Sequence, residues 1–78
     1  MKSFVAVAEA LHFGRAAEAL RIAQPAVSQQ VRKLEAELGV ELFTRDRHGV
    51  ALTAAGRTLV KEAKTILAHV TYAREEVE

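Results

Sequence analysis

The chain has 78 residues, of which half are hydrophobic and 27% are charged, and it contains no cysteine. This composition is typical of one folded globular domain, and it excludes a disulfide-stapled scaffold and a disordered tail. No apolar stretch approaches the roughly 18 residues that a membrane span needs, and the N-terminus lacks a signal-peptide pattern. We therefore expect no membrane association and a cytoplasmic location.

The charges are unevenly distributed along the chain, although the formal net charge is only +1. Residues 11–33 carry four cations against one anion, and residues 44–61 have the same balance, so each stretch has a net charge of +3. Acidic residues lie between the two stretches and at the C-terminal end. The net charge alone argues against a nucleic-acid ligand, but two separate basic zones are compatible with phosphate contacts.

Two helices are predicted in the first third of the chain. The alanine-rich stretch 14–20 predicts a short second helix, entered between His12 and Gly14, because alanine is the strongest helix former. The first helix is predicted over about residues 1–10, without an N-terminal cap, from hydrophobic residues at helical spacing. These residues are Phe4, Val7, Ala8 and Leu11.

A third helix is predicted over residues 24–38. Pro25 indicates its start, because a proline in the first turn removes only an N–H group that has no intrahelical partner. Gly39 suits a left-handed cap at its end. Only residues 21–23 separate this helix from the second, so the two are expected to form a helix-turn-helix unit. Its expected buried stripe is Val27, Val31, Leu34 and Leu38.

Two short strands, 42–45 and 50–53, are expected next around a polar turn. The remaining residues, from 54 onward, contain no proline and are expected to form one long helix with Thr53 as its N-cap. Hydrophobic residues follow spacings of four and three along this helix, which is typical of a heptad seam, so we predict a homodimer. The seam consists of Leu59, Ala63, Ile66, Val70, Ala73 and Val77.

The sequence contains no recognisable catalytic or metal-binding arrangement. The three histidines, His12, His48 and His69, lack metal-ligand spacing and have no serine or aspartate in a catalytic relation to them. The large apolar residues are interpreted as core packing, not as a ligand pocket, and they include Phe4, Phe13, Phe43 and Leu52. We therefore predict neither an enzyme nor a cofactor or metal in this chain.

Several short motifs follow one another in a specific order along the whole chain. They are Ala6-Val7-Ala8-Glu9, Phe13-Gly14-Arg15-Ala16-Ala17, Gln24-Pro25-Ala26-Val27-Ser28, Leu34-Glu35, Leu42-Phe43-Thr44-Arg45 and Leu52-Thr53-Ala54-Ala55-Gly56. Their order and spacing resemble the N-terminal DNA-binding domain of LysR-type bacterial transcription regulators. One departure is Ala23, where the family usually has a serine that can cap the third helix through its side chain.

The resemblance implies a mainly helical fold, a winged helix-turn-helix head at residues 1–53 followed by a linker helix at 54–78. The helix-turn-helix falls on residues 13–32, the recognition helix on about 24–38 and the wing on about 42–53. Linker helices of this family pair in antiparallel fashion within a dimer, and the resemblance is compatible with either a dimer or a tetramer of the intact protein. A small-molecule effector would bind the C-terminal domain that family members carry and this chain lacks.

The resemblance also implies which residues contact double-stranded DNA. The expected base readers in the major groove are Gln24, Pro25, Ser28 and Gln29. Arg32, one turn beyond Ser28, is expected to reach a guanine edge or a phosphate. Contacts to the DNA backbone, or to the minor groove from the wing, are expected from Lys33, Arg45, Arg47 and Thr53.

Each of these interpretations has a simpler alternative. The polar face of the third helix is also compatible with an ordinary solvated surface, and the wing arginines with a loop charged for solubility. The alternative function is a helical protein-interaction module without specific DNA binding, in which the heptad helix is the functional part. That alternative predicts little affinity for duplex DNA and no steep salt dependence.

Overall fold

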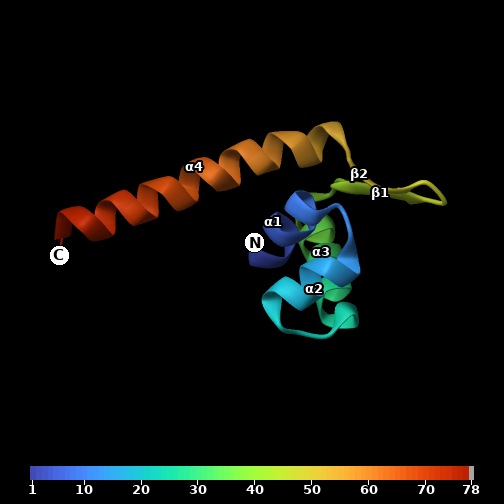
Figure 1. Cartoon of the computed structure of the whole chain (residues 1–78). Helices are drawn as coiled ribbons and strands as arrows, with labels where there is room; N and C mark the ends of the chain where they lie inside the picture. The colour runs from blue at the N-terminus through green and yellow to red at the C-terminus, as the bar shows by residue number, and fades with distance from the viewer. Residues whose placement is uncertain (78) are drawn as a thin grey trace.

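A computed structural model describes the backbone of residues 1–77 and the side chains of residues 1–65. Three helices form a head, a two-stranded hairpin projects from it, and a long helix runs across it and beyond (Figure 1). The elements are α1 (Lys2–Ala10), α2 (Phe13–Leu20), α3 (Gln24–Leu38), β1 (Phe43–Asp46), β2 (Gly49–Leu52) and α4 (Ala54–Val77). The expected fold class is confirmed. Within the described range no helix is both long and apolar enough to cross a membrane.

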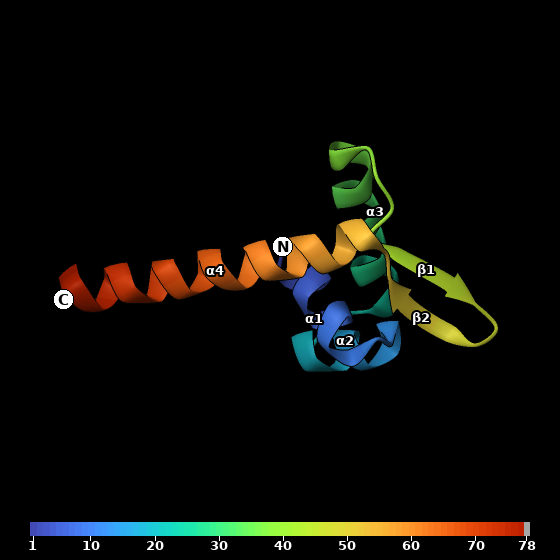
Figure 2. The same ribbon diagram turned by 90° about the horizontal axis from the view of Figure 1, so that it is seen from above.

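The hairpin is antiparallel and has a two-residue turn. Phe43 pairs with Leu52 and Asp46 with Gly49, so the strands are shifted by about one residue from the expected ranges. The Asp46 carboxylate accepts a hydrogen bond of 2.7 Å from the backbone N–H of His48, which stabilises the turn. Seen from above, the hairpin projects on the side of the head opposite the C-terminal end of α4 (Figure 2).

The core lies where α1, α2, α3 and the start of the wing meet. The rings of Phe4 and Phe43 have centroids 5.5 Å apart, and those of Phe13 and Phe43 are 5.9 Å apart in an edge-to-face arrangement. Leu52 is half-buried against this cluster. The interpretation of these residues as core packing is confirmed. The fully assembled core consists of Phe4, Val7, Phe13, Ala16, Ala17, Val27, Val31, Leu42 and Phe43.

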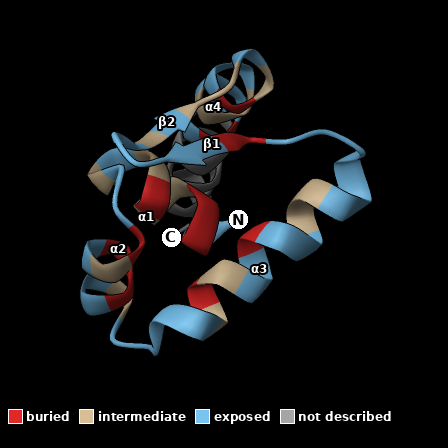
Figure 3. Cartoon of the chain, turned by 90° about the vertical axis from the view of Figure 1, so that its right-hand side faces the viewer, coloured by how far each residue is buried: buried red, intermediate tan, exposed pale blue. Residues whose placement is uncertain are grey.

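Two of the residues expected on buried stripes are exposed. Leu11 is 44% exposed because it is the C-cap of α1, and its left-handed backbone, with φ of 49°, turns it off the helical face. Leu38 is 49% exposed. The last turn of α3 extends beyond the other helices, so no element covers it (Figure 3). The prediction was right for Val27 and Val31, which are fully buried, and wrong for Leu38.

Three helix ends show how local sequence sets the boundaries. Thr53 caps α4, since its Oγ1 accepts a hydrogen bond of 3.0 Å from the N–H of Gly56. Gly39 ends α3 in the left-handed region, with φ of 71°. Ala23 stands at the N-cap of α3 without any side-chain hydrogen bond, as expected. All three of these predictions are confirmed.

The first turns of α4 pack against the head of the same chain. Leu59 and Val60 are half-buried against the core, and Ala63 is only 1% exposed. This corrects the expectation that Ala63 faces a partner helix, because its own chain already covers it. The remaining seam residues lie outside the described side chains, and they are Ile66, Val70, Ala73 and Val77.

Candidate nucleic-acid interface

The N-terminal half of α3 presents a polar face to solvent. Its buried side is formed by Val27 and Val31, which hold the helix on the core. One helical turn contains 3.6 residues, so the side chains on the opposite side point away from the head. Pro25, Gln29, Arg32 and Lys33 are exposed there, and Ser28 is half-buried at its edge. Gln24 is exposed as well, at the first residue of α3, but on the side of the helix that is turned toward α2.

The start of α3 lies close to the start of α2. A Cβ atom added to Gly14 would lie 2.9 Å from Cε1 of His12 and 3.5 Å from Oε1 of Gln24. Because Gly14 has no side chain, the His12 imidazole and the Gln24 carboxamide can both lie next to its Cα atom. His12 is the N-cap of α2, with its Nδ1 accepting a hydrogen bond of 3.0 Å from the N–H of Arg15. This cap was not predicted from the sequence, because histidine is not among the usual capping residues.

The recognition helix and the wing border one open hollow of about 360 Å³. Arg32 of α3 and Arg45 of β1 both line it, so the structure brings together one expected base reader and one expected wing contact. Arg47 lies in the exposed hairpin turn, outside this hollow. The other residues lining the hollow are Glu35, Glu41, Phe43 and Thr44.

Two side-chain hydrogen bonds fix α3 relative to its neighbours. Glu35 accepts a bond of 2.7 Å from the backbone N–H of Leu42, which ties α3 to the start of the wing. Ser3 of α1 is 3% exposed and donates a hydrogen bond to the Gln30 side chain of α3. Neither contact was predicted from the sequence. Glu35 belongs to one of the motifs, but a single serine in an amphipathic helix carries no recognisable signal.

Thr53 uses both of its hydrogen-bond donors inside the chain. Its hydroxyl donates to the carbonyl of Glu41 at 2.7 Å, and its backbone N–H donates to the carbonyl of Leu42 at 3.0 Å. A phosphate oxygen only accepts hydrogen bonds, and a threonine hydroxyl has a single proton to donate. The expectation that Thr53 contacts the DNA backbone is therefore corrected, since the residue has a structural role between the wing and α4.

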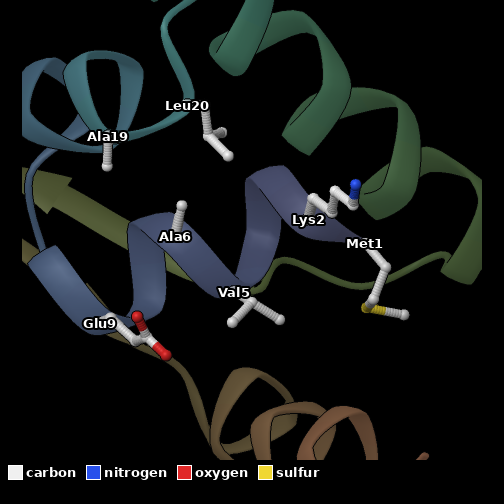
Figure 4. Close-up of a pocket in the computed structure, with 7 residues that line it drawn as sticks. All are labelled: Met1, Lys2, Val5, Ala6, Glu9, Ala19 and Leu20. Carbon is white, nitrogen blue, oxygen red and sulfur yellow. The ribbon is translucent and has the colours of Figure 1, made fainter. Parts of the chain in front are cut away.

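A second hollow, on another part of the head, is apolar. It has a volume of about 290 Å³ and lies between α1 and α2, where Ala19 and Leu20 point toward Ala6 (Figure 4). Val5 and Met1 extend its apolar lining, and Lys2 and Glu9 complete it. None of the residues expected to contact DNA lines this groove. Within the described side chains, no group of histidine, aspartate and glutamate is arranged to hold a metal ion.

Residues 1–57 match the family model described as bacterial regulatory helix-turn-helix protein, lysR family. The chain belongs to this family. Over 77 residues this lysR-family chain is 49% identical to the HTH-type transcriptional regulator HdfR of Escherichia coli O139:H28, strain E24377A / ETEC. The similarity covers 99% of this chain but 28% of HdfR, so the chain spans little more than a quarter of that relative.

Two solved structures of lysR-type domains resemble the chain over nearly its whole length. The CbnR DBD–DNA complex has a TM-score of 0.89 and 40% identity, with 96% of this chain and 86% of that chain covered. The BenM DBD/catB site 1 DNA complex has a TM-score of 0.91 and 37% identity, with 97% and 85% covered. The lysR-family fold of this chain is therefore the same as that of two domains whose structures contain DNA.

Proposed function

We propose that this chain binds double-stranded DNA sequence-specifically, as the DNA-binding part of a transcription regulator. The single observation that carries this proposal is the similarity, at 40% identity and a TM-score of 0.89, to the CbnR DBD in its DNA complex. The exposed polar face of α3 supports it independently. We assign no enzymatic activity to the chain, and we place the regulator in the bacterial cytoplasm, where its DNA target lies.

The proposed base readers lie on the first turns of α3. In a helix-turn-helix protein this part of the second helix enters the major groove, where each base pair presents a distinct pattern of donors and acceptors. The amides of Gln24 and Gln29 and the hydroxyl of Ser28 can both donate and accept hydrogen bonds. Pro25 offers apolar surface to a thymine methyl group, and Arg32 extends the reading face toward a guanine or a phosphate.

The proposed backbone contacts come from exposed cations on both sides of the reading face. Lys33 follows the base readers on α3, while Arg45 and Arg47 lie on the wing. Each phosphate that these side chains neutralise releases condensed counterions, so the affinity falls as the salt concentration rises. These contacts hold the domain on any duplex and do not select a sequence.

The proposed active form is a homodimer joined through α4, with residues 1–53 as the head and residues 54–78 as the linker helix. Leu59 is half-buried on its own head, so the contribution of the seam to dimerisation is expected mainly from Ile66 onward. A two-fold dimer presents two recognition helices to successive major grooves, so its preferred site is an interrupted inverted repeat. An effector-binding domain and tetramer formation belong to the intact regulator.

Substitutions on the two kinds of contact test this assignment. Ser28→Ala and Gln29→Ala are expected to relax the base preference, because they remove side chains that read base edges. Arg45→Ala is expected to weaken binding to every duplex alike and to reduce the salt dependence. Affinity is measured by fluorescence anisotropy for the preferred duplex and for an unrelated duplex. Unchanged sequence preference in both helix variants would refute the assigned roles.

A further inference from the structure

Arg45 has an exposed side chain that lies on the face of the hairpin turned toward the head. Successive side chains of a strand point to opposite faces, so Arg45 shares a face with Phe43, which is 5% exposed and part of the core. The register pairs Arg45 with Val50 and Phe43 with Leu52, and both partners are half-buried. Arg45 is therefore the first residue beyond the core residue Phe43 on the face of β1 that is turned toward the head.

The Arg45 guanidinium lies over the ring of Phe13, with Cζ 3.9 Å from the ring centroid. This distance is well within the range of a cation–π contact. Phe13 is 6% exposed at the first residue of α2, and its ring packs edge-to-face against Phe43. The ring is thus held in place by the core, and it can hold the guanidinium in turn.

The stacked guanidinium keeps its hydrogen-bonding groups free. Its N–H bonds lie in the plane of the group, so a ring against one face leaves the edge accessible. None of the hydrogen bonds found among the described side chains is donated by Arg45. The same side chain lines the hollow between α3 and β1, which Arg32 also lines. A cation fixed at this hollow, with unused donors, is suited to a phosphate.

We propose that Phe13 is a positioning residue for DNA binding, which holds the Arg45 guanidinium at the hollow so that it contacts a phosphate of the duplex. This inference rests on the proposed function. In this proposal the buried Phe13 ring increases the affinity for DNA, and it does so only through Arg45 of the wing. It also requires arginine at position 45, because the ammonium group of lysine keeps the charge but has no planar face to stack or fork to bind phosphate.

A double-mutant cycle with Arg45→Lys and Phe13→Leu tests the coupling. The probe is a duplex of arbitrary fixed sequence, bound by the 78-residue chain over a range of salt concentrations. Each single variant is expected to weaken binding about two- to fivefold, the range that a cation–π contact at an exposed site supplies. The double variant is expected to bind no more weakly than either single variant. The slope of log Kd against log salt stays the same in all of them, because the charge is kept.

Arg45→Gln supplies a readout that a purely structural contact would not change. Removing one phosphate contact lowers the magnitude of the salt slope by about one, whereas loss of structural packing leaves the slope unchanged. Arg47→Lys is the matched wing variant, because no ring contact is found for Arg47 among the described residues, and it is expected to lose less affinity than Arg45→Lys. Circular dichroism establishes that each variant is folded.

The outcomes separate this inference from the proposed function. Additive losses in the cycle, or an unchanged salt slope for Arg45→Gln, overturn the positioning role while the chain still binds DNA. If Phe13→Leu does not fold, the comparison of Arg45→Lys with Arg47→Lys decides. Equal losses of affinity in these two variants overturn the positioning role. Failure of the unsubstituted chain to bind the duplex contradicts the proposed function itself.

Discussion

Gly56 is where the wing and α4 approach each other most closely. A Cβ atom added at this buried position would lie 2.2 Å from the carbonyl oxygen of Leu42 and 2.8 Å from Cδ2 of Leu52. Ordinary contacts of a Cβ atom begin at 3.4 Å, so Gly56→Ala leaves the first of these contacts 1.2 Å too short. The leucine side chain at position 52 can rotate away, but the carbonyl is part of the backbone.

The structure leaves little freedom to relieve this clash. The Leu42 carbonyl accepts a hydrogen bond of 3.0 Å from the N–H of Thr53, and the Leu42 side chain is 1% exposed in the core. Either this hydrogen bond breaks or α4 moves away from the head. Overpacking of this kind costs about 1–3 kcal/mol, and the gain from replacing glycine in a helix offsets up to about 1 kcal/mol. We expect a net loss of about 1–2 kcal/mol in the free energy of unfolding.

Urea unfolding followed by circular dichroism at one fixed protein concentration measures this loss. For a domain of this size, each kcal/mol corresponds to a fall in Tm of about 4–8 °C. Gly39→Ala is the control, because a Cβ atom there meets nothing within 4 Å and only the left-handed backbone, with φ of +71°, is strained. Hydrogen exchange of the Thr53 amide should accelerate in Gly56→Ala alone. A Gly56→Ala chain as stable as the unsubstituted one, with a protected Thr53 amide, would refute the reasoning.

Three further predictions concern the ends of the helices and the seam. Ala23→Ser is expected to raise the free energy of unfolding by about 1 kcal/mol, because it adds the missing cap of α3; an unchanged urea midpoint would contradict this. Thr53→Val keeps the volume but leaves the Glu41 carbonyl and the Gly56 N–H without their partner, so a loss of about 1–3 kcal/mol is expected in the same assay, and a neutral effect would argue against the cap. Ile66→Glu is expected to convert a dimer into a monomer in sedimentation velocity, and a persistent dimer would count against the seam.

Local signals in the sequence were sufficient to predict most of the element boundaries. Pro25 and Gly39 restrict their own backbone, so they indicate the start and end of α3 without knowledge of the surroundings. Thr53 is equally local, because a capping hydroxyl bonds to an N–H three residues away. The polar face of α3 follows from the spacing of Val27 and Val31, since the buried side of a helix determines the exposed one.

The contacts that link different elements could not be predicted from the sequence. The exposure of Leu38 depends on where the other helices end, and the burial of Ala63 depends on the direction in which α4 leaves the wing. The stacking of Arg45 on Phe13 joins residues 13 and 45 through the tertiary fold. Periodicity describes one element at a time, so it assigned Ala63 to a partner helix and gave no indication that Arg45 lies over the Phe13 ring.

Selection of duplexes from a random DNA pool by this chain tests the central claim most directly. The affinity for the selected duplex and for an unrelated one is then measured across a salt series. We predict an enriched interrupted inverted repeat, bound more tightly than unrelated DNA, with log Kd rising linearly with log salt for both duplexes. A pool without any enriched sequence, together with weak binding that does not depend on salt, would contradict the claim and favour a protein-interaction module.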